Sequence, residues 1–534
     1  MSNEGRLQTA DMNNEPTEID ALAAPSGDGE VLVWPDPQHI PRLIERNRRL
    51  RQGYEFQLAG RPATTLLKLD HSGEPVIMTG HQPAFIHPGV WIKGLAAEQL
   101  AAKVGGQARF LAVDTDAVHR LALEWPEEEG GAYQVRRTAP MGSAGDLSYA
   151  QLPRRGAAEW SDVFAGPLAA CSRWGAGTLS AFAGAFLGDD DPHGGAGVAY
   201  MDRWTRGMEA TERATALPAT RAVRVSDAFA VGRHEGIAAF VGHLILHAAE
   251  FAASYNAALA EYREQRGLRG RHHPIPDLAI EDRRTELPLW LVGESGPRRR
   301  FIVSTEAHRG VRLWAGTESV GTVGHRELLA NPREVLRSVL ARRELMPRAL
   351  TLTMYARLFA CELFIHGIGG AKYDQIADGV IRRFFGVEPP AYVCVSGTVR
   401  LPLRLREVSE ADRAAGQRRI RDRIWNPQRH LDAAAGTRLA GLVEERAEAV
   451  AESGRLRREA PGEHAARRTA FSRIHQATRA IVAAVPGPSA GARAELERVE
   501  RLLADNRVAR SREWFFALYP PDQLRRLVAA LPFG

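Results

Sequence analysis

Residues 75–93 read PVIMTGHQPAFIHPGVWIK, and this stretch indicates the fold class. It begins with a short apolar run typical of a strand, which ends at Gly80. Residues 90–104 repeat apolar side chains at helical spacing, and residues 108–113 (ARFLAV) again have the pattern of a strand. A strand, a helix and a second strand within roughly 40 residues are the unit from which parallel sheets are built. The stretch therefore predicts a parallel sheet with helices packed on it.

The same pattern returns far along the chain. Residues 361–368 (CELFIHGI) have the pattern of a buried strand, residues 373–385 that of a helix, and residues 391–395 that of a further strand. Two such units predict an α/β fold with a Rossmann-like core. Open α/β sheets bind ligands at the carboxyl ends of their strands, so we expect the two strand-to-helix turns to share a pocket.

The chain has 534 residues, more than one compact core holds. Residues 234–266 predict one long helix, and the Ala-, Arg- and Glu-rich stretch near the C-terminus predicts antiparallel helices of the coiled-coil type. The expected organisation is a disordered tail at 1–30, a core at 31–406 with inserted segments around 130–330, a helical coiled-coil hairpin at 407–510, and a closing segment at 511–534 that packs back on the core.

Composition argues against several classes of protein. The sequence has no run of 18 apolar residues, so we expect no membrane span. Arginines alternate with Glu and Asp along helical stretches, which is typical of a solvated face and argues against a nucleic-acid partner. The three cysteines, Cys171, Cys361 and Cys394, are too scattered for a disulfide framework and indicate a cytoplasmic protein.

Lysine is rare in this chain. The 70 basic residues include four lysines: Lys68, Lys93, Lys103 and Lys372. The sequence uses arginine wherever a generic positive charge suffices, so a lysine that is kept has a raised chance of being needed as a compact ammonium donor. Lys93 and Lys372 each follow one of the two glycine turns.

The first turn concentrates hydrogen-bonding groups. Its candidates for binding a phosphate or carboxylate with helix N-terminal amides are Gly80, Gln82 and Gly89. His81 and His87 are candidates for the general acid or base, since imidazole titrates near neutral pH. Lys93 is the candidate for neutralising charge in the transition state. The alternative is a Pro- and Gly-rich loop whose histidines only satisfy backbone groups.

The second turn, residues 365–374 (IHGIGGAKYD), also leads a strand into a helix through glycines. Backbone amides in such a turn can cradle a phosphate or carboxylate. The candidate binding residues are His366, Gly367, Gly369, Gly370, Lys372 and Tyr373. A tight turn kept for packing is the alternative.

Asp114 and Asp116 end the strand after the first turn. Two aspartates in this pattern can hold Mg²⁺ together with a nucleotide, because hard cations prefer oxygen ligands. Asp116 is also a catalytic candidate that could orient an amine. The alternative is a helix cap, in which Asp116 accepts backbone amides. Glu286 or an arginine of the run 298–300 could reach the site from the inserted region, although a capped strand and a solvated turn explain them too.

The stretch TGHQPAFIHPGVWIKGLAAEQLAAK, followed by FLAVDTDAVH, resembles the loop, helix and acidic strand end of the bacillithiol biosynthesis cysteine-adding enzymes. HGIGGAKYDQIADGVIRRFFG, a helical segment and REWFFALYPPDQL follow in the order found in that family. The resemblance covers most of residues 75–534 and is strong at the two turns. His81 stands where the family has a glutamine, and DTD departs from its acidic pattern. The positions that carry over are Gly80, Gln82, Asp116, Gly369 and Gly370. The shorter stretch QPAFIHPG is similar to a loop of the WbqC-like proteins linked to polysaccharide synthesis.

The resemblance implies a Rossmann-like core similar to nucleotidyltransferases, with an ATP or ADP site and a coiled coil that forms a homodimer. It also implies a ligase that condenses an amino acid, cysteine in that family, with the amine of a small sugar-derived substrate. Two other functions stay open. One is a metal-dependent nucleotidyl- or glycosyltransferase that uses the two aspartates, and the other is a non-catalytic scaffold that recruits a partner through its coiled coil.

Overall fold

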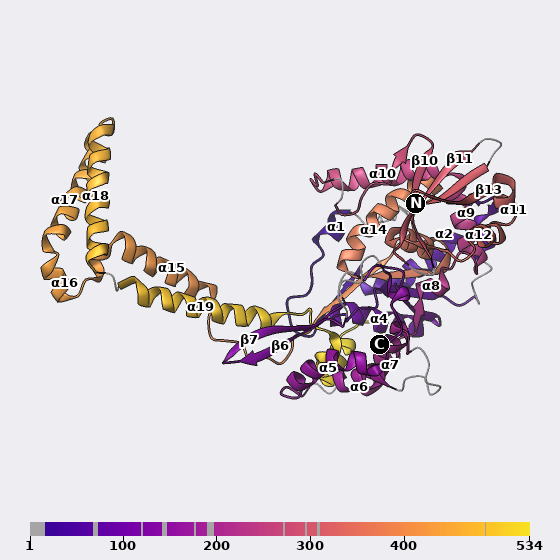
Figure 1. Cartoon of the computed structure of the whole chain (residues 1–534), viewed down its shortest axis with the longest axis horizontal. Coiled ribbons are helices and arrows are strands. Elements are labelled where there is room, and N and C mark those ends of the chain that lie inside the picture. The colour runs from indigo at the N-terminus through magenta and orange to yellow at the C-terminus, as the bar shows by residue number, and fades with distance from the viewer. Residues whose placement is uncertain are drawn as a thin grey trace, which may run out of the picture. The chain divides into compact units, whose positions relative to one another are not determined.

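The computed structural model of the protein describes residues 16–67, 73–118, 121–140, 147–175, 178–188, 197–270, 273–293, 296–306, 310–485 and 488–534. The chain forms two compact units (Figure 1). Unit 1 comprises Met1–Trp125, Arg136–Leu401 and Ser511–Gly534, and unit 2 comprises Pro126–Val135 and Pro402–Arg510. The sequence placed this boundary at residue 407 and counted residues 126–135 with the core. The structure groups that short segment with the helices instead.

A six-stranded sheet lies at the centre of unit 1. Its order is β1-β16-β15-β4-β5-β8, and every neighbouring pair is parallel except β1 with β16. The strands are β1 (Glu30–Trp34), β4 (Val76–His81), β5 (Gln107–Ala112), β8 (Ala222–Arg224), β15 (Leu363–His366) and β16 (Val393–Thr398). The predicted α/β fold with parallel strands is confirmed. Strand β8 comes from the region around 130–330, so that region is more than an insertion, because it completes one edge of the sheet.

The two predicted strand–helix–strand units run in opposite directions from the middle of this sheet. Strand β4 continues through α4 (Pro88–Val104) to β5 on one side, and β15 continues through α14 (Ile368–Val380) to β16 on the other. β4 and β15 are themselves neighbours. Because such crossovers are right-handed, they place α4 and α14 on opposite faces of the sheet. The topological switch point therefore falls between the carboxyl ends of β4 and β15.

Helix α4 is buried along most of its length. Pro88 occupies its first turn, where a missing N–H costs nothing, and Gly105 ends it with a left-handed φ of 64°. The helix packs on β4, β5 and β16 and against α20 (Pro521–Ala529) of the closing segment. Phe516 stacks on Trp91 with ring centroids 5.1 Å apart. The closing segment thus belongs to the same core as the first turn.

An antiparallel sheet and further helices complete unit 1. The second sheet has the order β13-β12-β11-β10-β14, with β9 paired to β10. Its strands are β9 (Ile280–Glu281), β10 (Arg284–Val292), β11 (Arg299–Glu306), β12 (Gly310–Ala315), β13 (Glu318–Gly324) and β14 (Glu344–Pro347), and a separate small pair is β2 (Gln57–Leu58) with β3 (Arg61–Pro62). The other helices are α1 (Pro16–Ala21), α2 (Ile40–Gln52), α3 (Ala63–Leu67), α5 (Ala157–Cys171), α6 (Thr178–Leu187), α7 (Tyr200–Ala214), α8 (Val225–Ala228), α11 (His325–Ala330), α12 (Pro332–Leu340) and α13 (Ala349–Tyr355), with π-helical turns η4 (Ala356–Ala360) and η5 (Ile381–Phe385).

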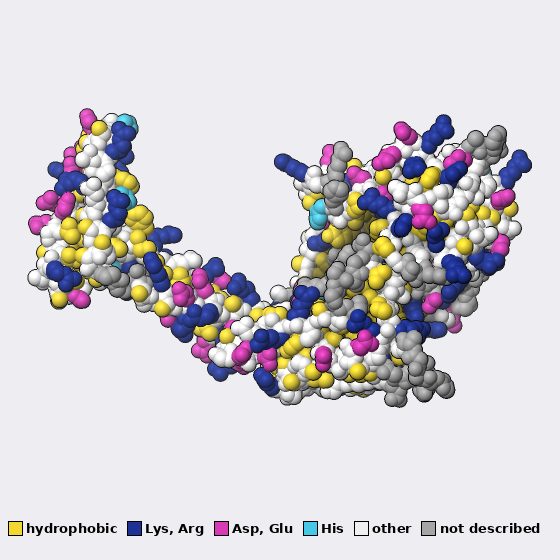
Figure 2. Space-filling view, in the orientation of Figure 1, with side chains coloured by type: hydrophobic (Ala, Val, Ile, Leu, Met, Phe, Trp, Pro, Cys, Tyr) yellow, Lys and Arg dark blue, Asp and Glu magenta, His cyan; other side chains and the backbone are white. Residues whose placement is uncertain are grey.

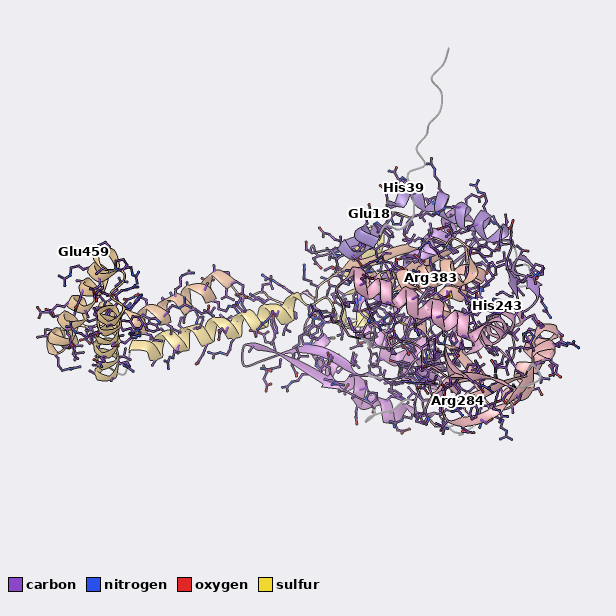
Figure 3. The ribbon with its side chains drawn as sticks, turned by 90° about the horizontal axis from the view of Figure 1, so that it is seen from above. Glu18, His39, His243, Arg284, Arg383 and Glu459 are labelled. Carbon is purple, nitrogen blue, oxygen red and sulfur yellow. The ribbon has the colours of Figure 1, made fainter. Side chains whose placement is uncertain are left out.

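The long helix expected over residues 234–266 is wrong. The chain forms α9 (Glu235–Leu246) and α10 (Ala248–Gln265), bent by 90°. His247 leaves helical geometry at the bend, and its ring lies 4.5 Å from that of His243. His243, in α9, is labelled in Figure 3. The apolar spacing continues through the bend, so periodicity alone does not reveal it. Within the described ranges, no single helix has the length and apolar character to cross a membrane, whereas this bent pair meets both criteria jointly.

The expected tail at 1–30 is partly ordered. Residues 1–15 lie outside the described residues, but α1 follows them and packs on α14. Ile19 of α1 is fully buried in a cluster with Tyr392 and Cys394. One apolar side chain in an acidic segment gave too weak a signal to predict this contact.

Unit 2 is mainly helical. Helix α15 (Glu410–Trp425) packs on α19 (Pro488–Arg510), and α17 (Ala440–Glu459) packs on α18 (His464–Ala484), with the short α16 (Ala433–Arg438) before α17. The hairpin of β6 (Leu123–Glu129) and β7 (Ala132–Thr138) contributes its tip. Basic and acidic side chains are interspersed on the visible face of these helices (Figure 2). The coiled-coil form of this unit stays a prediction.

Candidate functional site

The two glycine turns meet at the switch point between β4 and β15. His81 is the last residue of β4, and Gly367 is the N-cap of α14 directly after β15. Thr79 lies opposite Ile365 in the parallel register. The residues that follow Thr79 and those that follow Ile365 therefore leave the sheet side by side.

Lys93 lies at the centre of this junction. The residue is 4% exposed, and its Nζ donates to the Gly80 carbonyl at 2.7 Å. A Cβ on Gly367 would stand 3.8 Å from the Lys93 Cδ. No carboxylate among the described residues forms an ion pair with Lys93, and burial lowers its pKa to about 8. A buried ammonium that donates one hydrogen bond and has no counter-ion in the described part of the chain keeps donors available for an anion.

The two histidines of the first turn are held neutral. Burial lowers the pKa of His81 to about 4, and the nearby charge of Lys93 is the second-largest cause of this shift. Burial, followed by the charge of Arg512, lowers the pKa of His87 to about 3. His87 is the N-cap of α4, and its Nδ1 accepts from the Gly89 amide at 3.1 Å. His87 thus serves its own helix, whereas His81 lies beside Lys93 with its Nδ1 3.1 Å from the Gln82 carbonyl.

His366 is the histidine with an orienting carboxylate. Its Nε2 lies 3.1 Å from Oδ2 of Asp374. That oxygen also accepts from Arg357, and Oδ1 of the same carboxylate accepts from the Thr353 hydroxyl. Burial opposes ionisation, but the Arg357 guanidinium holds the pKa of the Asp374 carboxyl well below its usual range. Burial lowers the pKa of His366. A carboxylate that accepts from Nε2–H leaves the lone pair on Nδ1, which is the arrangement of a base and its orienting group.

The glycines of the two turns were expected to let a ligand approach the backbone, but most of them allow close contacts within the protein. Helix α14 begins at Ile368, five residues earlier than predicted, so Gly369 and Gly370 lie in its first turn. A Cβ on Gly370 would stand 3.0 Å from Nδ1 of His366. A Cβ on Gly80 would stand 2.9 Å from the Leu111 carbonyl, and one on Gly89 2.5 Å from Arg512. The close approach that glycine permits is therefore used by the protein's own groups at Gly80 and Gly89, while a Cβ on Gly369 would meet nothing within 4 Å.

Two further cations lie near Lys93. Arg512 donates to the hydroxyls of Thr398 and Ser396, each at 3.1 Å, and has no ion pair among the described residues. Burial raises the pKa of the Cys394 thiol to about 12, and the charges of Lys93 and Lys372 both act on that thiol to oppose the shift. Sequence reasoning missed Arg512, although it precedes the closing motif EWFF. It also missed Arg357, which no motif marks.

Tyr373 is not part of this group. The residue is 44% exposed and lies toward Tyr262 of α10. The position one turn into α14 places it on the face of the helix opposite to Ala371, which is fully buried.

The two aspartates have protein partners. Asp114 is buried and accepts from the amide and the hydroxyl of Ser226. Asp116 accepts from Gln82 Nε2 at 2.8 Å and pairs with Arg298 at 3.2 Å. In the part of the chain that is described, no three His, Cys, Asp or Glu side chains are grouped as metal ligands. An ion here would have to displace these contacts, so the two carboxylates as they stand do not fit Mg²⁺.

Glu212 of α7 links that helix to α4 by a hydrogen bond. Its raised pKa leads us to expect that the stability of the chain depends on pH. Its carboxylate accepts from Trp91 Nε1 at 3.1 Å and from Thr220, and burial raises its pKa to about 7. A raised folded-state pKa gives stability that is present below the unfolded pKa of about 4 and lost as pH rises through 7. We expect the free energy of unfolding, relative to Glu212→Gln, to fall by about 3 kcal/mol between pH 4 and 7.

Urea unfolding of both proteins across this pH range measures the difference. Glu209→Gln, on the same helix, is the control and should follow the parent chain. A difference between parent and Glu212→Gln that is constant from pH 4 to 7 would show that folding does not raise the pKa of Glu212.

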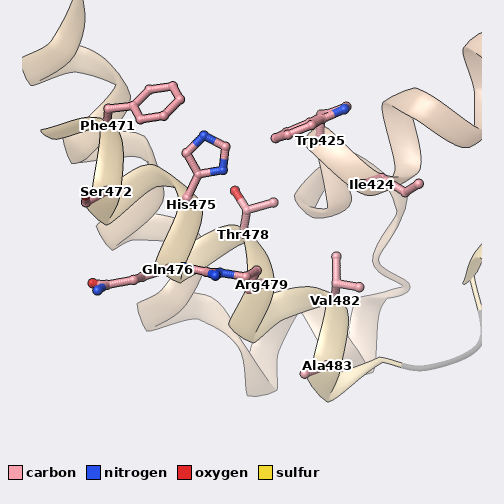
Figure 4. Close-up of a pocket in the computed structure, with 10 residues that line it drawn as sticks. All are labelled: Ile424, Trp425, Phe471, Ser472, His475, Gln476, Thr478, Arg479, Val482 and Ala483. Carbon is pink, nitrogen blue, oxygen red and sulfur yellow. The ribbon is translucent and has the colours of Figure 1, made fainter. Parts of the chain in front are cut away.

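A separate cavity of about 640 Å³ lies on unit 2 (Figure 4). Ile424 and Trp425 at the end of α15 face Phe471, His475 and Val482 of α18 across it (Figure 4). Trp425 is 51% exposed and Phe471 60% exposed. Sequence reasoning missed this surface, because two helices far apart in the sequence build it.

No protein-family model matches this sequence, and no curated protein matches it either.

Proposed function

We propose that unit 1 is a ligase-type enzyme that condenses an amino acid with the amine of a small sugar-like substrate, at the expense of ATP. The observation that carries the proposal is the buried ammonium of Lys93, which has no counter-ion among the described residues and lies at the switch point between the parallel strands β4 and β15. This is the edge at which open α/β folds bind ligands. The resemblance to cysteine-adding enzymes supports a Rossmann-like, nucleotidyltransferase-like core and an amino-acid substrate, of which cysteine is the first to test.

The cations of the site suit a polyphosphate. Lys93, Lys372 and Arg512 would hold the phosphates of ATP, because none of the three has an ion pair among the described residues. A bound nucleotide supplies the free energy that activates the carboxylate of the amino acid. No metal step is part of the proposal, since Asp114 and Asp116 are engaged with Ser226, Gln82 and Arg298.

His366 is the proposed base. An amine attacks an activated carboxyl group only as the free base and must lose a proton as the amide bond forms. The neutral imidazole, oriented by Asp374, accepts that proton on Nδ1. Arg357 balances the charge of Asp374 and so keeps His366 neutral and ready to accept. His81 and Gln82, the latter fixed by Asp116, line the side of the switch point toward β5.

Calorimetry and a turnover assay test the proposal. The chain should bind ATP or ADP, and it should consume ATP only when both an amino acid and an amino sugar are present, with cysteine and glucosamine as the first pair. Failure to bind either nucleotide at millimolar concentration would remove the ligase proposal.

We also propose that two copies associate through the cavity on unit 2. Phe471 protrudes beside a hollow lined by Ile424, Trp425 and Val482. A two-fold interface needs one surface that offers both a projection and a hollow, so that each copy fills the other.

Sedimentation equilibrium tests this association. Phe471→Glu should weaken the dimer at least about tenfold, because it buries a charge in the contact. Val450→Glu, which changes another exposed apolar residue, on α17 outside the cavity, should leave the dimer unchanged. A parent chain that stays monomeric at high micromolar concentration would contradict the association.

A further inference from the structure

A cavity of about 570 Å³ on unit 1 is lined by no residue of the two glycine turns. One wall is the bend between α9 and α10, from Ile245 to Glu250, and the other is formed by β10, β11 and β12 of the antiparallel sheet. His325, the first residue of α11, also lines it. The volume falls within the roughly 300–1,000 Å³ of small-molecule sites. The cavity therefore has the size to hold a ligand, and its lining indicates which kind.

Part of the lining is apolar and buried. Ile245 of α9, Val303 of β11 and Val311 of β12 are 2%, 3% and 8% exposed. Covering apolar surface with a hydrocarbon group is favourable, because it removes that surface from water. These side chains suit the hydrocarbon part of a ligand.

A buried hydroxyl of the lining has no hydrogen-bond partner among the described residues. Thr285 of β10 lies opposite Val303 in the antiparallel register, and both line the cavity, so their side chains share one face of the sheet. Thr285 is 8% exposed, and no described group forms a hydrogen bond with its hydroxyl. Burying a hydroxyl without a partner is costly, and folded proteins keep few such groups. A ligand oxygen that accepts from Thr285 would remove this cost.

The charges around the cavity favour an anion. Helix α10 has 18 residues and begins at Ala248 without a side-chain cap from His247. The first amides of a helix have no acceptor within it and lie at the positive end of its dipole. Arg283 lines the same cavity and forms no ion pair with any residue in the described ranges. The acidic lining residue is Glu250, whose carboxylate lies 3.6 Å from the ring of His247.

We infer that this cavity binds a carboxylic acid with a short hydrocarbon tail. The carboxylate accepts from the Thr285 hydroxyl near the start of α10 and Arg283, and the tail covers the apolar lining. A neutral ligand would leave Arg283 without a counter-ion, and a small inorganic anion would leave the apolar lining uncovered. The inference does not depend on the ligase proposal, because the cavity shares no residue with the Lys93 junction.

Three probes test the inference by calorimetry on the full chain. Octanoate has a carboxylate and a hydrocarbon tail, octanol keeps the tail without the charge, and acetate keeps the charge without the tail. Octanoate should bind at least about tenfold more tightly than either of the others. It should bind Lys93→Met and Phe471→Glu as tightly as the parent chain, because neither the Lys93 junction nor the cavity on unit 2 holds it.

Variants of the lining locate the site. Thr285→Val keeps the shape of the side chain and loses the hydroxyl, so octanoate should bind about tenfold more weakly. Thr285→Ser keeps the hydroxyl and should retain most of the affinity. Thr322→Val changes an exposed threonine of β13 outside the cavity and should bind octanoate like the parent chain. Arg283→Gln, at an exposed position, should weaken binding by about two- to fivefold, because water screens an exposed charge.

Failure of octanoate to bind at millimolar concentration would overturn the inference, as would equal affinities for octanoate and either of the other probes. Octanoate that binds Thr285→Val as tightly as the parent chain would place the carboxylate elsewhere and overturn it too. ATP binding is measured separately on the parent chain. Its absence would remove the ligase proposal and leave this site unaffected.

Discussion

Replacing Lys93 by methionine should weaken ATP binding by 10- to 100-fold, on the order of the 1.5–3 kcal/mol that a hydrogen bond to a charged group contributes. The methionine fills nearly the same buried space and removes the ammonium that donates to the Gly80 carbonyl. Turnover should fall further, because charge that develops on the phosphates in the transition state loses its nearest cation. Calorimetry on the parent chain and on Lys93→Met measures the change in ATP affinity.

Lys103→Met is the control for this prediction, since Lys103 lies in the last turn of the same helix. ATP binding to the parent chain should also weaken as pH rises through about 8, where Lys93 loses its proton. Lys93→Met should not show this dependence. Equal ATP affinity in Lys93→Met and the parent chain would place the nucleotide elsewhere.

Asp374→Asn should lower the free energy of unfolding by about 3–5 kcal/mol, the cost of breaking a buried ion pair by removing one partner. Asp374 and Arg357 are both almost fully buried, and Asp378 is then the one carboxylate left to pair with the guanidinium within the described residues. The variant should also lose amine-dependent turnover, because His366 loses the group that sets its tautomer.

The stabilisation that Asp374 contributes should depend on pH. A carboxyl whose folded pKa is depressed contributes stability above its unfolded pKa of about 4, and that stability is lost as pH falls through the folded pKa. The difference between parent and variant should therefore be full at neutral pH and shrink in acid. Asp522→Asn removes one partner of an exposed pair with Arg526 and should change stability by less than about 1 kcal/mol. A similarly small effect of Asp374→Asn would contradict the buried network.

The sequence was sufficient for the centre of the fold. Apolar runs that end in Gly80 and Gly367 marked two strand-to-helix turns, and both lie at the carboxyl edge of one sheet. Such runs bury both faces of a parallel strand, so they stand out without any partner being known. The rarity of lysine also directed attention to Lys93, which the structure places between the two turns.

The sequence was insufficient where a contact joins distant segments. Arg357 and Arg512 are ordinary arginines in a chain rich in that residue, and their roles depend on tertiary neighbours such as Asp374 and Ser396. The same holds for Gly89, whose close neighbour is Arg512 rather than a ligand. The bend at His247 left no trace in the apolar spacing of α9 and α10.

Lysine-selective NMR tests the central claim most directly, because a chain with four lysines gives few lysine signals. With labelled lysine and Lys93→Met for assignment, the Lys93 ammonium should titrate near pH 8 in the free protein. Addition of ATP should raise that midpoint by about one unit or more, since a bound phosphate favours the charged form. A Lys93 signal that titrates near its ordinary value of about 10.4 and does not move with ATP would contradict an anion site at the switch point.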